Sequence, residues 1–288
     1  PPGTDLTRNL TFASDVKTRV PLTANGPREI AVHGKDIYVA NYFSDNLHFL
    51  HLDYLSAPFV GTIDLGGPTV ETTERFGEMS FYDAKICFQN WQSCHSCHPF
   101  TRPDMLNWDL QKDGLGNPRN AKSMLWAHRT PPVHADGGRP EAHDAVDAGI
   151  RYEQFTEPSL ARVLALDTFL MYMKPVPSPL LENGRLSATA EAGKTIFHDK
   201  AKVDCSICHP APLYTNQQKY VTGTGADPTL GTVEWDTPTL VETWRTAPYA
   251  HEGQYATMDE ILQVHGHTNA YQLTQQEFDA LVEYVESL

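Results

Sequence analysis

The first part of the chain shows short runs of alternating apolar and polar residues, a pattern that is typical of β-strands. Residues 28–32, 37–42 and 47–52 carry such runs, and residues 60–65 could add a further strand. Turn-forming residues separate them. The pattern predicts one meandering β-sheet within residues 1–70. A single sheet cannot bury both of its faces alone, so we expect it to pack on the rest of the protein or to end a longer array.

Beyond about residue 70 the pattern changes to helical spacing, interrupted by long proline-containing loops. Apolar residues recur at helical intervals in four segments, residues 74–82, 158–173, 187–197 and 274–288. Ser187 or Thr189 could cap the third of these helices. Prolines at positions 175, 177 and 179 mark a linker between the second and third helices.

Two of these helices look like copies of one another. The first contains Gly77 and Phe81, and the later one contains Gly193 and Phe197 at the same spacing. Each helix leads into a cysteine-containing motif. The repeat therefore predicts two related domains, residues 71–180 and 181–288.

Composition and charge narrow the class of protein. The 288 residues are 40% hydrophobic, and no run of about 18 apolar residues is present, so we expect no membrane span. The net charge of −14 argues against nucleic acid and anionic membranes as partners and suits a basic redox partner. The sequence starts Pro1-Pro2-Gly3, without a leader, so a signal peptide has been removed or the chain is part of something longer.

Four of the five cysteines form two Cys-x-x-Cys-His motifs. These are Cys94 to His98 and Cys205 to His209. Two thiols three positions apart can form thioethers with the two vinyl groups of one porphyrin, and the following histidine then lies under the ring and binds the iron. A zinc site would require the distant pairs to meet, and a thioredoxin-like pair does not need the histidine. The motifs therefore predict two covalently bound haem c groups, with Cys94, Cys97, Cys205 and Cys208 as attachment residues.

Two further expectations follow from the cysteines. Cys87 is left over, and we expect it to be a buried, small apolar side chain because no neighbouring cation is visible that would activate it. Thioether attachment of haem takes place outside the cytoplasm. We therefore expect a periplasmic, cell-surface or secreted protein.

Residues 236–253 resemble the "TPTL…TAPYxHDG" signature of bacterial dihaem cytochrome c peroxidases and MauG-type enzymes. Residues 97–120 resemble the branch of that family in which a YVTN β-propeller is fused to the peroxidase, and residues 1–70 resemble one propeller blade. The resemblance implies a mainly α fold with two cytochrome c-like domains and one haem each. It also implies a calcium ion at their shared interface, although no acidic loop with calcium spacing is evident.

The resemblance assigns roles to the iron ligands. The haem on His98 would react with peroxide, and the haem on His209 would transfer electrons. In the family, the second iron has a further ligand downstream of the signature, and the matching position is His265. Met258 is an alternative, but it lies inside a helix that we expect over residues 257–264 and is too near His251 for the family's spacing. His267 is next in line. A histidine pair would hold the potential of this haem lower than a His/Met pair.

The distal side of the first haem follows the family less closely. Residues 99–124 lack the usual distal histidine, and His128 and His134 are the nearest candidates, as ligands, acid/base groups or plain loop residues. Glu153 or Glu157 could take the role of the family's distal glutamate. The family's inter-haem tryptophan is not in its usual place, because Trp126 is offset.

These observations favour an oxidoreductase that reacts with hydrogen peroxide at the first haem, while the second haem stores and transfers electrons. Either a small cytochrome supplies the electrons, or a residue of a protein substrate is oxidised, as in MauG-type enzymes. The histidine pair and the missing early distal histidine tilt the balance slightly towards the second outcome. The alternative is a pure electron-transfer protein in which both irons have six ligands.

Overall fold

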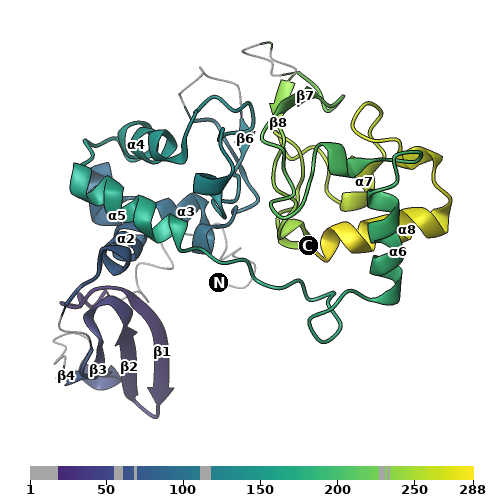
Figure 1. Ribbon diagram of the computed structural model, residues 1–288. Coiled ribbons are helices and arrows are strands. Elements are labelled where there is room, and N and C mark those ends of the chain that lie inside the picture. Colours follow the sequence, from purple (N-terminus) through teal and green to yellow (C-terminus); the bar gives the residue numbers. More distant parts are fainter. Residues whose placement is uncertain (1–18, 55–60, 68–69, 111–117, 227–230, 232–233) are drawn as a thin grey trace, which may run out of the picture. The chain divides into compact units, whose positions relative to one another are not determined.

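The computed structural model describes residues 19–54, 61–67, 70–110, 118–226, 231 and 234–288 (Figure 1). The chain divides into two compact units, Pro1–Glu71 and Thr72–Leu288. We describe each unit by itself. Within the larger unit, residues 72–180 are called the first half and residues 181–288 the second half.

The small unit contains a four-stranded antiparallel sheet. Its strands follow chain order: β1 (Pro27–His33), β2 (Asp36–Asn41), β3 (Asn46–His51) and β4 (Gly61–Asp64). The predicted meander is therefore confirmed. Val39 and Leu50 are buried on the two central strands, while every residue of the edge strand β1 is exposed.

The larger unit contains all seven α-helices of the described residues. They are α2 (Thr73–Tyr82), α3 (Cys94–Cys97), α4 (Ala142–Tyr152), α5 (Leu160–Met171), α6 (Ala188–Phe197), α7 (Met258–Leu262) and α8 (Gln275–Glu286). The four helices predicted from apolar spacing correspond to α2, α5, α6 and α8, and the helix expected over residues 257–264 corresponds to α7. Ser187, rather than Thr189, caps α6, because its Oγ accepts a hydrogen bond from the Ala190 amide at 3.0 Å. None of the helices in the described residues could span a lipid bilayer.

Two small hairpins complete the larger unit. One pairs β5 (Asn107–Trp108) with β6 (Arg119–Asn120), and the other pairs β7 (Lys219–Val221) with β8 (Glu234–Asp236). We expected a mainly α fold. The two hairpins and the four-stranded sheet instead make the described residues mixed α/β. Strands of two or three residues are too short to show alternation in the sequence.

The two halves repeat one helix crossing. A Cβ atom at Gly77 of α2 would lie 1.8 Å from the Ala165 carbonyl oxygen of α5, and one at Gly193 of α6 would lie 1.9 Å from the Ala280 carbonyl oxygen of α8. Glycine is required because the helix backbones touch at these points. Phe81 and Phe197, one turn later, are both buried. The glycine and phenylalanine repeat in the sequence thus marks the same crossing in each half.

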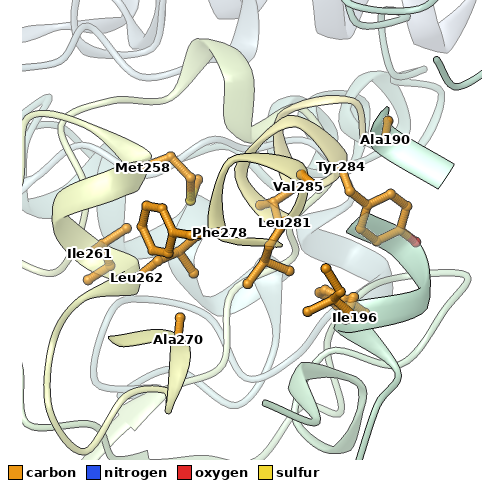
Figure 2. Close-up of a cluster of buried hydrophobic side chains, with 12 residues drawn as sticks. Ala190, Ile196, Met258, Ile261, Leu262, Ala270, Phe278, Leu281, Tyr284 and Val285 are labelled. Carbon is orange, nitrogen blue, oxygen red and sulfur yellow. The ribbon is translucent and has the colours of Figure 1, made fainter. Parts of the chain in front are cut away.

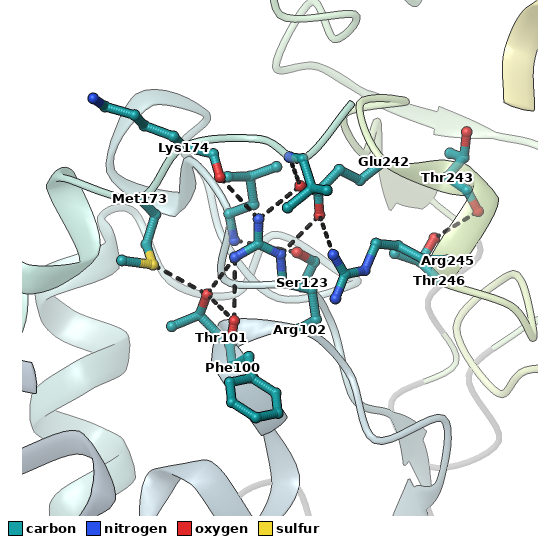
Figure 3. A network of polar contacts seen from close by, with 12 residues as sticks. Phe100, Thr101, Arg102, Ser123, Met173, Lys174, Glu242, Thr243, Arg245 and Thr246 are labelled. Carbon is teal, nitrogen blue, oxygen red and sulfur yellow. Dashed lines mark hydrogen bonds and ion pairs between the residues drawn. The ribbon is translucent and has the colours of Figure 1, made fainter. Parts of the chain in front are cut away.

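Each half has its own hydrophobic core. The first is built from α2, α4 and α5, and the second from α6, α7 and α8 with the turn before α8 (Figure 2). The halves are joined by polar contacts, including an ion pair between Arg102 and Glu242 (Figure 3). Residues of both halves line one cavity between the two cores.

Candidate haem sites

The first Cys-x-x-Cys-His motif forms one helical turn. Ser93 and Ser96 close a capping box at its start, and the His98 amide donates to the Cys94 carbonyl at its end. The Nδ1 atom of His98 lies 3.0 Å from the carbonyl oxygen of Lys122. Because a carbonyl can only accept, the proton is on Nδ1 and the lone pair is on Nε2. This is the tautomer that binds iron through Nε2.

The second motif repeats this arrangement. Cys205–Ile207 form a 3₁₀ turn, and Nδ1 of His209 donates to the Tyr214 carbonyl oxygen at 2.9 Å. Burial, with a smaller contribution from the charge of neighbouring His267, lowers the pKa of His209 to about 4. His209 is therefore a neutral imidazole, the form that acts as a metal ligand.

One cavity of about 930 Å³ contains both motifs. All four motif cysteines and both motif histidines line it, together with many apolar side chains. Its volume is at the upper end of the roughly 300–1,000 Å³ range of ligand pockets. Thiols, correctly protonated imidazoles and an apolar lining fit haem c in each half. The described residues contain no group of three or more His, Cys, Asp or Glu that could hold a metal ion, so calcium is implied by the resemblance alone.

Helix α4 lines the cavity with small and with larger apolar residues. Three of its lining residues are small, Ala142, Ala145 and Gly149, and the other two are Val146 and Ile150. The carboxylate of Glu153 lies over Gly149, since a Cβ atom there would be 2.9 Å from Glu153 Oε2. Buried Gln154 also lines the cavity. The first site thus combines open space with a carboxylate and an amide.

Glu153 is held close to the first motif. Gln92, two residues before Cys94, donates its side-chain amide to the Glu153 carbonyl oxygen. Burial raises the pKa of the Cys94 thiol to about 12, with the charge of Glu153 as the next cause. The carboxylate therefore lies within electrostatic range of the attachment cysteines.

Helix α7 lines the cavity with large residues. They are Met258, Ile261 and Leu262, whereas three of the five lining residues of α4 are small. His267 follows and also lines the cavity, and its Nδ1 donates to the Ile261 carbonyl oxygen at 3.1 Å. His265, in contrast, is exposed, stacks on Tyr271 with ring centroids 4.2 Å apart, and is not among the lining residues. The structure therefore directs His267, and not His265, toward the second haem site.

The other candidate residues, His128, His134 and Glu157, differ in whether they reach the cavity. His128 is turned toward buried Asp167, with Nε2 3.3 Å from Asp167 Oδ1, and does not line the cavity. His134 lines the cavity, and its carbonyl oxygen accepts from Lys122 Nζ at 3.1 Å. Glu157 is on the surface, paired with Arg151. Of the two glutamates considered, only Glu153 reaches the cavity.

Aromatic residues line the cavity from the second half. Trp235 and His251 stack with ring centroids 3.7 Å apart and an interplanar angle of 14°, and both line the cavity. Arg119 of the first half lies 5.8 Å above the Trp235 ring. Trp126, the offset tryptophan in the sequence, does not line the cavity and carries Arg129 over its ring instead.

Sequence reasoning missed several of these residues. Ala142, Ala145 and Gly149 are separated by helical intervals, so a face of small residues was the available signal. Lys122 and Asp167 had no such signal, because their partners are distant in the sequence.

Comparison with known protein families identifies the class of one domain. Residues 190–288 match the cytochrome c family model, so the chain carries a cytochrome c domain in its second half. This match supports haem c as the cofactor there. It covers the helices and loops that surround the second motif.

The particular relatives extend the similarity to most of the chain. The gamma subunit of hydrazine synthase from Kuenenia stuttgartiensis is 28% identical over 278 residues, covering 74% of this chain and 77% of the relative. A structure of K. stuttgartiensis hydrazine synthase is similar with a TM-score of 0.69 and 25% identity, covering 77% of this chain and 89% of that one.

Two structures of lower identity share the fold. A MauG-like protein associated with microbial copper homeostasis gives a TM-score of 0.61 at 20% identity, covering 78% of this chain and 91% of that one. The dihaem peroxidase BthA of Burkholderia thailandensis gives 0.58 at 16%, covering 80% and 90%. Together with the family match, these similarities support a dihaem c-type oxidoreductase.

Proposed function

We propose that this protein binds two haem c groups and reacts with hydrogen peroxide at the first, held by Cys94, Cys97 and His98. The second haem, held by Cys205, Cys208 and His209, stores and transfers electrons. The observation that carries this proposal is a difference between the two helices that line the cavity. Three of the five lining residues of α4 are alanine or glycine, whereas α7 contributes Met258, Ile261 and Leu262 and is followed by His267.

Glu153 is the acid/base group of this proposal. When bound, the first haem supplies the iron at which the peroxide O–O bond is cleaved. Glu153 accepts a proton from the incoming peroxide and returns it to the departing oxygen, so that two electrons and two protons convert one peroxide to two waters. Gln154, buried on the same wall, orients the peroxide by hydrogen bonding. The apolar lining excludes bulk water from the site.

In this proposal His267, in place of His265, would hold the second haem together with His209. Its Nδ1 is anchored on the Ile261 carbonyl, so its Nε2 lone pair can bind iron. Two imidazoles hold the second haem at a lower potential than an imidazole and a thioether would. Trp235, stacked on His251 in the cavity wall, offers a route for electrons between the sites.

The electrons come from a small cytochrome or from a residue of a protein substrate. The net charge of −14 suits a basic partner. Since haem attachment takes place outside the cytoplasm, the proposed location is periplasmic, cell-surface or secreted. The four-stranded sheet, with Ile30 and Val32 exposed on β1, fits one blade of a propeller.

The test compares two glutamates of the same region. E153Q should slow the reaction of the purified holoprotein with peroxide by about 10²–10⁴-fold, the usual contribution of a general acid/base group. E157Q is the matched control, because Glu157 is 85% exposed in its side chain and outside the cavity. Stopped-flow spectroscopy of both variants gives the rates. Equal rates for E153Q and the wild type would exclude Glu153 from the mechanism.

A second candidate function follows from the similarity to hydrazine synthase gamma, whose structure gives a higher TM-score than the peroxidases. In this reading the open site takes a small nitrogen compound instead of peroxide. Titrating the holoprotein with hydroxylamine and with peroxide distinguishes the two. The pure electron-transfer alternative needs a protein ligand on the first iron, and His128 is instead engaged with Asp167.

A further inference from the structure

Lys122 contacts both the first haem ligand and the second half of the unit. Its carbonyl oxygen accepts the Nδ1 hydrogen bond of His98, 24 residues earlier, at 3.0 Å. Its ammonium nitrogen lies 3.3 Å from Asp236 Oδ2, in β8 of the second half, and donates to the His134 carbonyl oxygen at 3.1 Å. One residue thus joins a proximal histidine to the opposite half.

Asp236 is a firm anchor for this contact. It is 6% exposed, and its amide donates to the Ala135 carbonyl oxygen at 2.8 Å, so β8 is held against the first half by backbone as well as side chain. The Lys122 ammonium is the cation hydrogen-bonded to its buried carboxylate. Removing either partner would leave an uncompensated charge at the junction.

The two haem sites differ in the residue that accepts the hydrogen bond of the motif histidine. His209 donates to the carbonyl of Tyr214, five residues later in the same half. The acceptor for His98 belongs instead to a residue whose side chain is fixed by the other half. A movement between the halves would therefore change the hydrogen bond of His98 and leave that of His209 in place.

We propose that Lys122 is a positioning residue that couples the proximal hydrogen bond of the first haem to the contact between the halves. A hydrogen bond from Nδ1 makes the imidazole a stronger donor to iron and stabilises the ferric state. Loosening the Lys122 carbonyl weakens that donation. The inference rests on the proposed function, in which the first iron has an open sixth position.

The test uses the iron–histidine stretching band in resonance Raman spectra of the reduced holoprotein, which arises from a five-coordinate haem. K122M, D236N and the K122M/D236N double variant should each shift this band to lower frequency. K122R should leave the band at its wild-type frequency. K219M is the matched control. Lys219 is a second lysine whose charge acts on Asp236, but the acceptor of the His98 hydrogen bond is the Lys122 carbonyl.

The midpoint potential of the first haem distinguishes an effect through the His98 hydrogen bond from an effect of the charges that the substitutions remove. The double variant leaves the net charge unchanged, so a positional effect should still raise the potential in it. Opposite shifts in K122M and D236N that cancel in the double variant, with an unchanged Raman band, would overturn the inference in favour of a charge effect. D236N alone is informative if K122M does not fold. A wild-type protein without the band would contradict the open first site, and the potentials would then test the coupling by themselves.

Discussion

Arg102 and Glu242, 140 residues apart in the sequence, form a bidentate ion pair at the junction of the two halves (Figure 3). Arg102 Nη2 and Nε lie 2.6 Å and 2.7 Å from the two carboxylate oxygens. Glu242 is completely buried, and Arg102 also donates to the Lys174 carbonyl oxygen at 3.0 Å. Since Arg102 follows His98 by four residues, the pair ties the loop of the first motif to the second half.

Breaking this pair should destabilise the protein strongly. R102M or E242M leaves a buried, unmatched partner, and we expect a loss of about 3–5 kcal/mol of unfolding free energy. The R102M/E242M double variant should lose less than the sum of the single variants. Denaturant unfolding of the holoprotein measures each value. K194M, which removes an exposed lysine next to Glu191, is the control and should change little. Additive losses would show that the pair is not coupled.

The helix crossing predicts opposite results for two glycine substitutions. G77A places a methyl group against the Ala165 carbonyl, which no side-chain rotation can relieve, so it should destabilise by about 2–3 kcal/mol. G149A meets only the end of the Glu153 side chain and gains helix propensity, so its stability should not fall. It should nevertheless slow the peroxide reaction by crowding the distal wall. Equal destabilisation by both substitutions would contradict the crossing.

The two histidines after α7 should differ in their spectra. H267A should convert the low-spin ferric signal of the second haem to a high-spin one, because it removes the residue that lines the cavity. H265A should leave the signal unchanged, since His265 stacks on the surface against Tyr271. Electron paramagnetic resonance of the ferric holoproteins distinguishes them. The reverse result would return the assignment to His265.

The contact between α4 and α5 should depend on pH. The hydrogen bond to Asp167, with nearby Asp144 and Asp147, raises the pKa of His143. Burial would raise the pKa of Asp167, but the hydrogen bonds from His128 and His143 outweigh burial and hold it below its ordinary value. The stabilisation by His143 is complete below its ordinary pKa of 6.5 and is lost as pH rises through the raised pKa. The stabilisation by Asp167 is present above its ordinary pKa of 3.8 and is lost as pH falls through the lowered one.

D167N removes both effects. The wild type should therefore exceed D167N in unfolding free energy by more at about pH 5.5 than at about pH 8.5. Denaturant titrations at the two pH values provide the comparison. A difference independent of pH would mean that the contact does not titrate.

The sequence predicts the local features of this protein well. The β-meander, five of the seven described α-helices and the burial of Cys87 follow from spacing and residue type. The helix α4 was not predicted, because three of its five cavity-lining positions are alanine or glycine, which weakens the helical pattern of large apolar residues. In the proposed function these small residues give the first site its space, so the pattern is weakest where that function needs space.

Long-range contacts could not be predicted in the same way. Lys122 meets Asp236, and Arg102 meets Glu242, only because the two halves fold against one another. The choice between His265 and His267 depends on which of the two side chains faces the cavity. The two residues are only two positions apart in a short turn, but their side chains point in different directions. Counting along the family signature favours His265, whereas the structure directs His267 inward.

The most direct test of the account is the electron paramagnetic resonance spectrum of the resting ferric holoprotein, before and after one equivalent of hydrogen peroxide. We predict one high-spin signal from the first haem, which peroxide alters, beside one low-spin signal of a histidine pair from the second. Two low-spin signals that peroxide does not change, even after half-reduction, would contradict an open first site and identify an electron carrier.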